Sequence, residues 1–145
     1  MSKHKKTICL DFDGVINSYT SGWKGPRCIP DKPVPYVFQW IETFIIMHCT
    51  PPESVCLAEN EGEYELCIYS SRSRYWFAKR AMKKWMIEHG FDKRFFEVIK
   101  FPSKKPPAYL TIDDRAFCFN GQMPRFNDIF SFVPWNKRPH TKNAI

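Results

Sequence analysis

The stretch Thr7-Ile-Cys-Leu-Asp-Phe-Asp-Gly14 joins a short apolar run to a polar turn. Residues 7–10 are apolar and β-prone, so we expect a buried strand there. Two carboxylates, Asp11 and Asp13, and a glycine, Gly14, stand directly after it. Because ligands of parallel α/β sheets bind beyond the carboxyl ends of the strands, this stretch predicts both a central strand and one side of a binding site.

Further expected elements alternate outward from this stretch. We expect a Gly/Pro-rich loop over 19–35, a helix over 36–48, a strand at 66–69 and a helix after Ser73 that ends near Gly90. Residues 95–101, 109–112 and 130–133 are further candidate strands. This alternation predicts an α/β fold with a central, mainly parallel sheet and helices on its faces. The 145 residues are enough for one domain, 1–145, with 136–145 as a peripheral tail.

Composition excludes several classes of protein. Hydrophobic residues make up 43% of the chain, which argues against intrinsic disorder. No apolar run approaches the roughly 20 residues that span a bilayer, and the N-terminal residues lack a signal-peptide pattern. We therefore expect a protein that is neither exported nor in the membrane, located in the cytoplasm, with its six cysteines reduced.

The net charge of +7 is unevenly distributed. Residues 51–65 hold five glutamates and no lysine or arginine, so the rest of the chain is more basic than the total. A basic surface attracts anions, and nucleic acids, nucleotides and other phosphorylated ligands are all candidates. A merely solvated basic face is the alternative explanation.

A second acidic pair, Asp113 and Asp114, follows the candidate strand at 109–112. At one edge of a parallel sheet these side chains would meet Asp11 and Asp13, and four such charges repel one another unless a cation neutralises them. An all-oxygen ligand set with room for water and phosphate favours Mg²⁺. Ser70, at the end of the second strand, can donate to a phosphoryl oxygen, and Lys105 can neutralise its charge.

These residues, in this order, resemble the four motifs of the haloacid dehalogenase (HAD) superfamily of phosphohydrolases. Asp11-Phe-Asp-Gly14 is similar to motif one, Ser70 to motif two, Lys105 to motif three and Asp113-Asp114 to motif four. The resemblance covers roughly residues 7–120 and implies a Rossmann-like, three-layer fold. The intervals between the motifs are too short for a large cap domain.

The resemblance also implies a mechanism and a set of roles. Asp11 would attack phosphorus to form an aspartyl-phosphate, and Asp13 would act as general acid and base. Asp11, Asp113, Asp114 and the backbone carbonyl of Asp13 would hold Mg²⁺. Only eight positions separate Lys105 from Asp113, so Lys104 is an alternative to Lys105, although Pro106 favours Lys105.

Ser70-Ser-Arg72 resembles a stretch in the phosphatase domain of bacteriophage polynucleotide kinases. This likeness implies that Ser70, Ser71 and Arg72, with Gly14, bind the phosphorylated substrate. It favours a nucleotide or a phosphorylated nucleic-acid end, and the cytoplasm of a bacterium or of a phage-infected cell.

Alternatives stay open for the function and for single residues. One is a catalytically silent module that binds nucleic acid or a protein partner. Phosphoryl transfer to an acceptor other than water is equally compatible with these residues. If Arg72 does not bind substrate, it is a surface arginine. If Ser70 or Ser73 does not bind phosphate, it caps the next helix.

Overall fold

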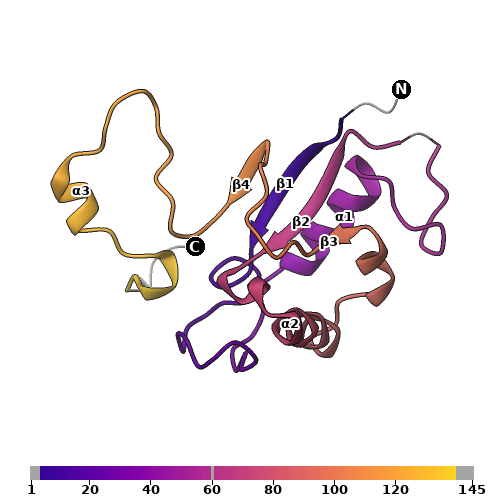
Figure 1. The fold of residues 1–145 in the computed structure, drawn as a ribbon, viewed down its shortest axis with the longest axis horizontal. Coiled ribbons are helices and arrows are strands. Elements are labelled where there is room, and N and C mark those ends of the chain that lie inside the picture. Colours follow the sequence, from indigo (N-terminus) through magenta and orange to yellow (C-terminus); the bar gives the residue numbers. More distant parts are fainter. Residues whose placement is uncertain (1–3, 60, 140–145) are drawn as a thin grey trace.

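The strand β1 (Lys6–Asp11) lies inside a four-stranded sheet, between β2 (Tyr64–Tyr69) and β4 (Leu110–Ile112), and β3 (Ile99–Lys100) pairs with β2. Every pairing in the sheet is parallel. The computed structural model describes residues 4–59 and 61–139 (Figure 1). The order β3-β2-β1-β4 confirms the predicted parallel α/β sheet and places the ends of β1 and β4 side by side.

Two longer helices and several short ones accompany the sheet. The two longer helices follow the predicted positions: α1 (Val37–His48) precedes β2, and α2 (Trp76–Glu88) follows it. The short ones are η1 (Ser71–Arg74), η2 (Lys93–Glu97), α3 (Phe126–Phe130) and η3 (Trp135–Lys137).

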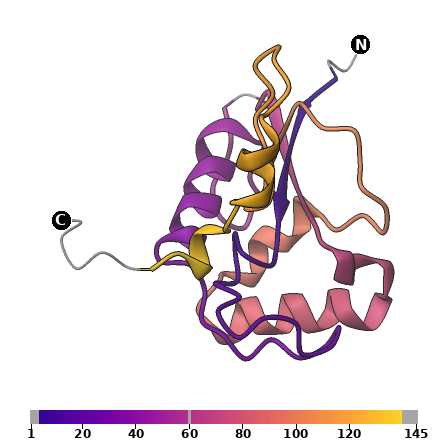
Figure 2. The ribbon, with the colours of Figure 1, turned by 90° about the vertical axis from the view of Figure 1, so that its left-hand side faces the viewer.

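One face of the sheet forms the core with both longer helices. Because side chains alternate along a strand, Ile8 and Leu10 share a face, and they pack in one cluster with residues of α1 and α2. Cys9 and Cys67 are also buried, but they lie on the opposite face and outside this cluster. The connection 101–109 runs along that side, across the sheet from α1 (Figure 2).

The expectation of helices on both faces is therefore wrong for the described residues. Residues 101–109 link β3 to β4 without a helix, and they contain three prolines, Pro102, Pro106 and Pro107. Proline removes a backbone donor and clashes with the preceding helical turn, so a helix cannot form there. The third layer of the predicted fold is replaced by a loop.

One predicted strand is wrong in part, and another is wrong. Residues 95–101 form the end of η2 and the two-residue β3, because the Asp92 carboxylate accepts from the Arg94 amide and starts a helical turn. Residues 130–133 form no strand, and α3 ends at Phe130. The segment between β1 and α1 contains isolated bridges, Asp13 with Asn17 and Asn17 with Pro33, and the described residues between α1 and β2 form turns and irregular structure.

The C-terminal segment extends from β4 beyond the edge of the sheet and then returns (Figure 1). On its return, Trp135 Nε1 donates to the Gly14 carbonyl at 2.7 Å, and Asn136 Nδ2 donates to the Ser18 carbonyl at 2.9 Å. Lys137 Nζ also donates to the Thr20 carbonyl at 2.8 Å, so the first residues of the predicted tail contact the loop that follows β1. Residues 140–145 lie outside the described residues. Among the described helices, none has the length and apolar character needed to cross a bilayer.

Candidate functional site

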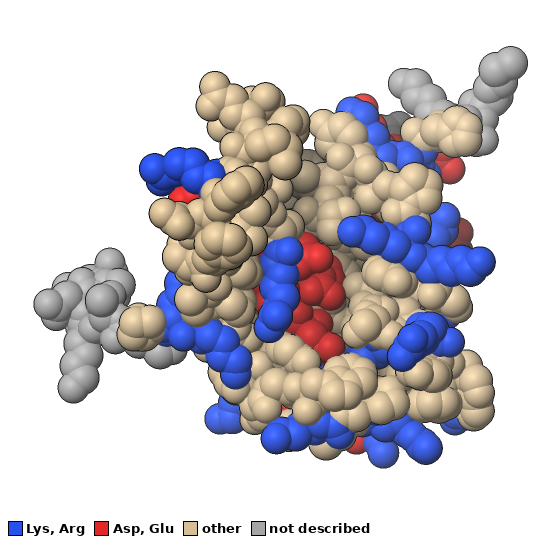
Figure 3. All heavy atoms as spheres, turned by 60° about the vertical axis from the view of Figure 1, so that its left-hand side comes forward, with Lys and Arg blue, Asp and Glu red and all other residues tan. Residues whose placement is uncertain are grey.

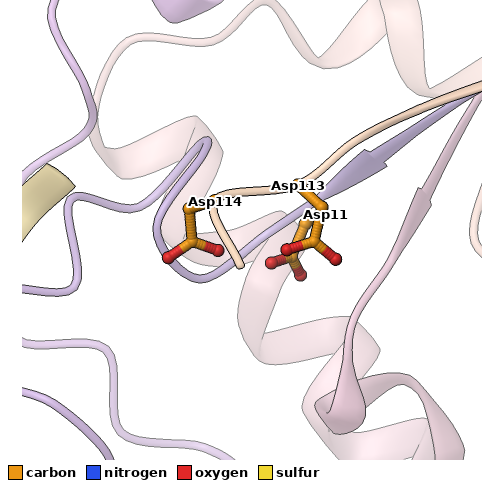
Figure 4. Close-up of side chains that lie close together, drawn as sticks. All are labelled: Asp11, Asp113 and Asp114. Carbon is orange, nitrogen blue, oxygen red and sulfur yellow. The ribbon is translucent and has the colours of Figure 1, made fainter. Parts of the chain in front are cut away.

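Three of the four predicted carboxylates converge at the ends of β1 and β4. Asp11, Asp113 and Asp114 each offer an oxygen within 4.8 Å of the others. Their side chains project to the same side of the chain (Figure 4). The parallel register that pairs Leu10 with Ile112 explains this convergence, because it brings the next residues of both strands to one edge.

The cluster is electrostatically unfavourable by itself. Burial, the charge of Asp113 and contact with Asp114 raise the pKa of Asp11 to about 8. Burial likewise raises the pKa of Asp114. Crowded carboxylates of this kind hold a proton near neutral pH unless a cation replaces it.

Asp114 provides a separate indication that a cation fits. Its Oδ2 is buried without a hydrogen-bond donor, and the nearest guanidinium nitrogen, Arg115 Nε, is 3.9 Å away. Gly14 lies directly against this carboxylate with a φ of +88°, and a Cβ there would collide with it. The three carboxylates offer only oxygen ligands, which Mg²⁺ prefers, and one of these oxygens, Asp114 Oδ2, has no hydrogen-bond partner.

The fourth carboxylate, Asp13, belongs to a different set of contacts. Arg72 Nε donates to Asp13 Oδ2 at 2.9 Å, and Asn17 Nδ2 donates to Oδ1 at 3.0 Å. The Asp13 side chain is thus held apart from the cluster of three. That the Asp13 backbone carbonyl serves the metal stays a prediction.

Arg72 is fully buried, so the alternative of a surface arginine is wrong. Its Nη1 donates to the carbonyls of Gly25, Pro26 and Cys28, and the guanidinium stacks on the Trp23 ring at 4.7 Å from the ring centroid. Arg72 therefore holds Asp13 and the Gly/Pro-rich loop in place, and its Nη2 is buried without a partner. Among the residues predicted to bind substrate, it and Gly14 are the two that do not line the cavity described next.

The acidic cluster opens into a cavity of about 350 Å³. Ser70, Ser71 and Lys105 line it together with the four aspartates, whereas Lys104 does not. In a space-filling view the acidic side chains lie in a hollow bordered by lysine and arginine side chains (Figure 3). The geometry thus brings three of the carboxylates together and places Asp13, both serines and Lys105 around the same space.

Two serines, Ser70 and Ser73, cap the turn that follows β2. Ser70 Oγ accepts from the Arg72 amide at 3.2 Å, and Ser73 Oγ accepts from the Ser70 amide at 2.9 Å. Both serines thus act as caps, and Ser70 lines the cavity as well. Its hydroxyl hydrogen is not used by either contact, so it stays free to donate to a ligand.

Five cavity residues were not predicted as site residues: Cys9, Tyr19, Tyr69, Thr111 and Arg115. Among them, Arg115 brings a largely exposed guanidinium beside Asp114. Tyr19 has a φ of +58°, a conformation that non-glycine residues rarely adopt. The one sequence signal was the position of Arg115 directly after the second acidic pair; a tyrosine in an irregular loop carries no such signal.

Comparisons of the chain with family models, curated proteins and solved structures give no match.

Proposed function

We propose that the protein is a Mg²⁺-dependent phosphomonoester hydrolase of the HAD type, acting on a nucleotide or a phosphorylated nucleic-acid end. The observation that carries the proposal is the convergence of Asp11, Asp113 and Asp114 within 4.8 Å, in a cavity that Lys105 also lines. Three crowded carboxylates, of which Asp11 and Asp114 have a raised pKa, favour a divalent cation, and the cationic side chains that line the cavity favour an anionic substrate.

Asp11, Asp113 and Asp114 would hold the metal, with the Asp13 backbone carbonyl in support. When bound, Mg²⁺ supplies positive charge that offsets the charge of the phosphoryl oxygens. Lys105 and the Ser70 hydroxyl are the chain's own donors to those oxygens.

The reaction divides into two displacements at phosphorus. In the first, an Asp11 oxygen forms a bond to phosphorus while the ester P–O bond breaks, and Asp13 gives a proton to the leaving oxygen. In the second, a water oxygen attacks phosphorus, its proton passes to Asp13, and the Asp11–phosphorus bond breaks to release inorganic phosphate. Asp11 belongs to the cluster that would hold the metal, where a cation would keep its carboxylate ionised for attack, whereas Asp13 lies outside that cluster and lines the same cavity.

The first test is hydrolysis of a panel of phosphate monoesters with Mg²⁺ and with EDTA. We expect turnover only with Mg²⁺ and its loss in Asp11→Asn, whose side chain cannot form an acyl phosphate. Lys105→Ala should lower kcat by about 10²-fold, and Lys104→Ala, outside the cavity, much less.

Undiminished hydrolysis by Asp11→Asn would refute the nucleophile. No turnover of any ester, with folding intact and nucleic acid still bound, would instead favour the silent binding module.

A further inference from the structure

A second cavity of about 550 Å³ lies between α2 and residues 27–29 of the Gly/Pro-rich loop. The loop runs alongside α2 (Figure 2). Trp76, Arg80 and Lys84 line the cavity from α2, and their spacing of four residues places them along one side of the helix. Arg27 lines it from the loop. We call this cavity the α2 groove.

The α2 groove combines positive charge with flat aromatic surface. The Arg27 guanidinium lies 4.8 Å from the centroid of Phe77, and that of Arg80 lies 5.9 Å from the centroid of Trp76. Trp76 is 68% exposed, so burial in the core does not account for a tryptophan at this position. The lining holds three cationic side chains, Arg27, Arg80 and Lys84, and one carboxylate, Glu88. Glu88 pairs with Lys84 at 3.7 Å.

The groove is linked to the catalytic cavity by η1 and by the contacts of Arg72. Ser70 and Ser71 line the catalytic cavity, and η1 leads from them directly to Trp76. On the loop side, Arg72 binds Asp13 through Nε and the carbonyls that flank Arg27 through Nη1. A single buried arginine thus fixes both the catalytic carboxylate and the loop wall of the groove.

We propose that the α2 groove binds single-stranded nucleic acid, in continuation of a phosphorylated end held in the catalytic cavity. This inference rests on the proposed function and narrows its substrate from mononucleotides to strands. Arginine and lysine neutralise successive phosphates, and an exposed tryptophan next to an arginine offers a surface on which a base stacks. An acidic peptide would satisfy the cations but leave Trp76 without a stacking partner.

The test is the binding of a fluorescein-labelled single-stranded oligonucleotide, without a terminal phosphate and in EDTA, measured by fluorescence anisotropy. Because neither metal nor hydrolysis is involved, the outcome is independent of the catalytic proposal. We expect Trp76→Ala to weaken binding about tenfold, within the range for loss of one base stack. Arg80→Gln should lower the slope of log K against log salt by about 0.7, the value for one phosphate contact on a single strand.

Matched variants outside the groove control for loss of an aromatic ring or a charge. Trp40→Ala removes a half-exposed tryptophan from α1, and Lys93→Gln removes an exposed charge from η2; neither should change binding more than twofold. Circular dichroism checks that each variant is folded.

The two proposals fail in different ways. Hydrolysis of small esters by wild type, with oligonucleotide affinity equal in Trp76→Ala and Trp40→Ala, would overturn the groove and leave the catalytic proposal standing. Binding of polyglutamate as tight as that of an oligonucleotide of equal charge would overturn it too. Groove-dependent binding without hydrolysis of any ester would support the groove and refute the catalytic proposal.

Discussion

Replacing Asp113 by asparagine should stabilise the metal-free protein and remove its stabilisation by Mg²⁺. The oxygens of Asp11, Asp113 and Asp114 lie within 4.8 Å of one another. Two unit charges at that separation repel by about 3.5 kcal/mol at an effective dielectric constant of 20. The raised pKa of Asp11 leaves part of the cluster protonated at pH 7.5, which relieves part of this repulsion. We therefore expect a gain of about 1–2 kcal/mol, or roughly 3–6 °C in Tm for a domain of this size.

Thermal unfolding of wild type and Asp113→Asn in EDTA and in Mg²⁺ measures this effect. Mg²⁺ should raise the Tm of wild type and leave that of the variant nearly unchanged, because binding to the folded state alone stabilises it. Asp128→Asn is the control, since it removes an exposed carboxylate from α3, and it should respond to Mg²⁺ as wild type does. A variant less stable than wild type in EDTA, or one stabilised by Mg²⁺ to the same extent, would refute the metal cluster.

Three further predictions follow from the same contacts. As the pH rises from about 4 to 8, the metal-free protein should lose stability through Asp11, because its raised pKa makes the folded state keep a proton that the unfolded chain releases. Urea unfolding should show a larger loss in wild type than in Asp11→Asn, where only Asp114 still has a raised pKa, and equal pH profiles would contradict this. Gly14→Ala should weaken Mg²⁺ binding in calorimetry because its Cβ displaces the Asp114 carboxylate, whereas Gly22→Ala, with φ +74° and open space, should pay only the backbone cost of about 1–2 kcal/mol and keep its affinity. Arg72→Lys should lower the free energy of unfolding by about 3–5 kcal/mol, because lysine cannot reproduce the buried fork of contacts; a loss below about 1 kcal/mol would show that these contacts do not hold the loop.

The Arg72 contact gives the Gly/Pro-rich loop a physical role. This loop has little regular structure, yet three of its carbonyls bind one guanidinium whose Nε holds Asp13. A change in the loop conformation would therefore shift Arg72 and, with it, Asp13, the proposed general acid and base. The Trp135 donation to the Gly14 carbonyl connects the C-terminal segment to the same region.

The strands and longer helices followed from local patterns. The apolar runs before Asp11 and Ser70 became β1 and β2 because their hydrophobic residues pair in register in the sheet interior. The spacing of Ile41 and Ile45 likewise matched the buried side of α1. The strands predicted at 95–101 and 130–133 were not found as such, because an apolar composition is common to strands, short helices and exposed segments.

The sequence by itself determined the acidic pairs, their positions at strand ends and the parallel sheet, since these depend on residue type and on periodicity along a short stretch. Tertiary structure alone decided that Asp13 turns to Arg72 while Asp114 packs on Gly14, that Tyr19 and Arg115 join the cavity, and that the end of the chain returns to the loop after β1. Such contacts join residues up to 121 positions apart, and they depend on which side chains the folded core leaves room for, a quantity that no local pattern contains.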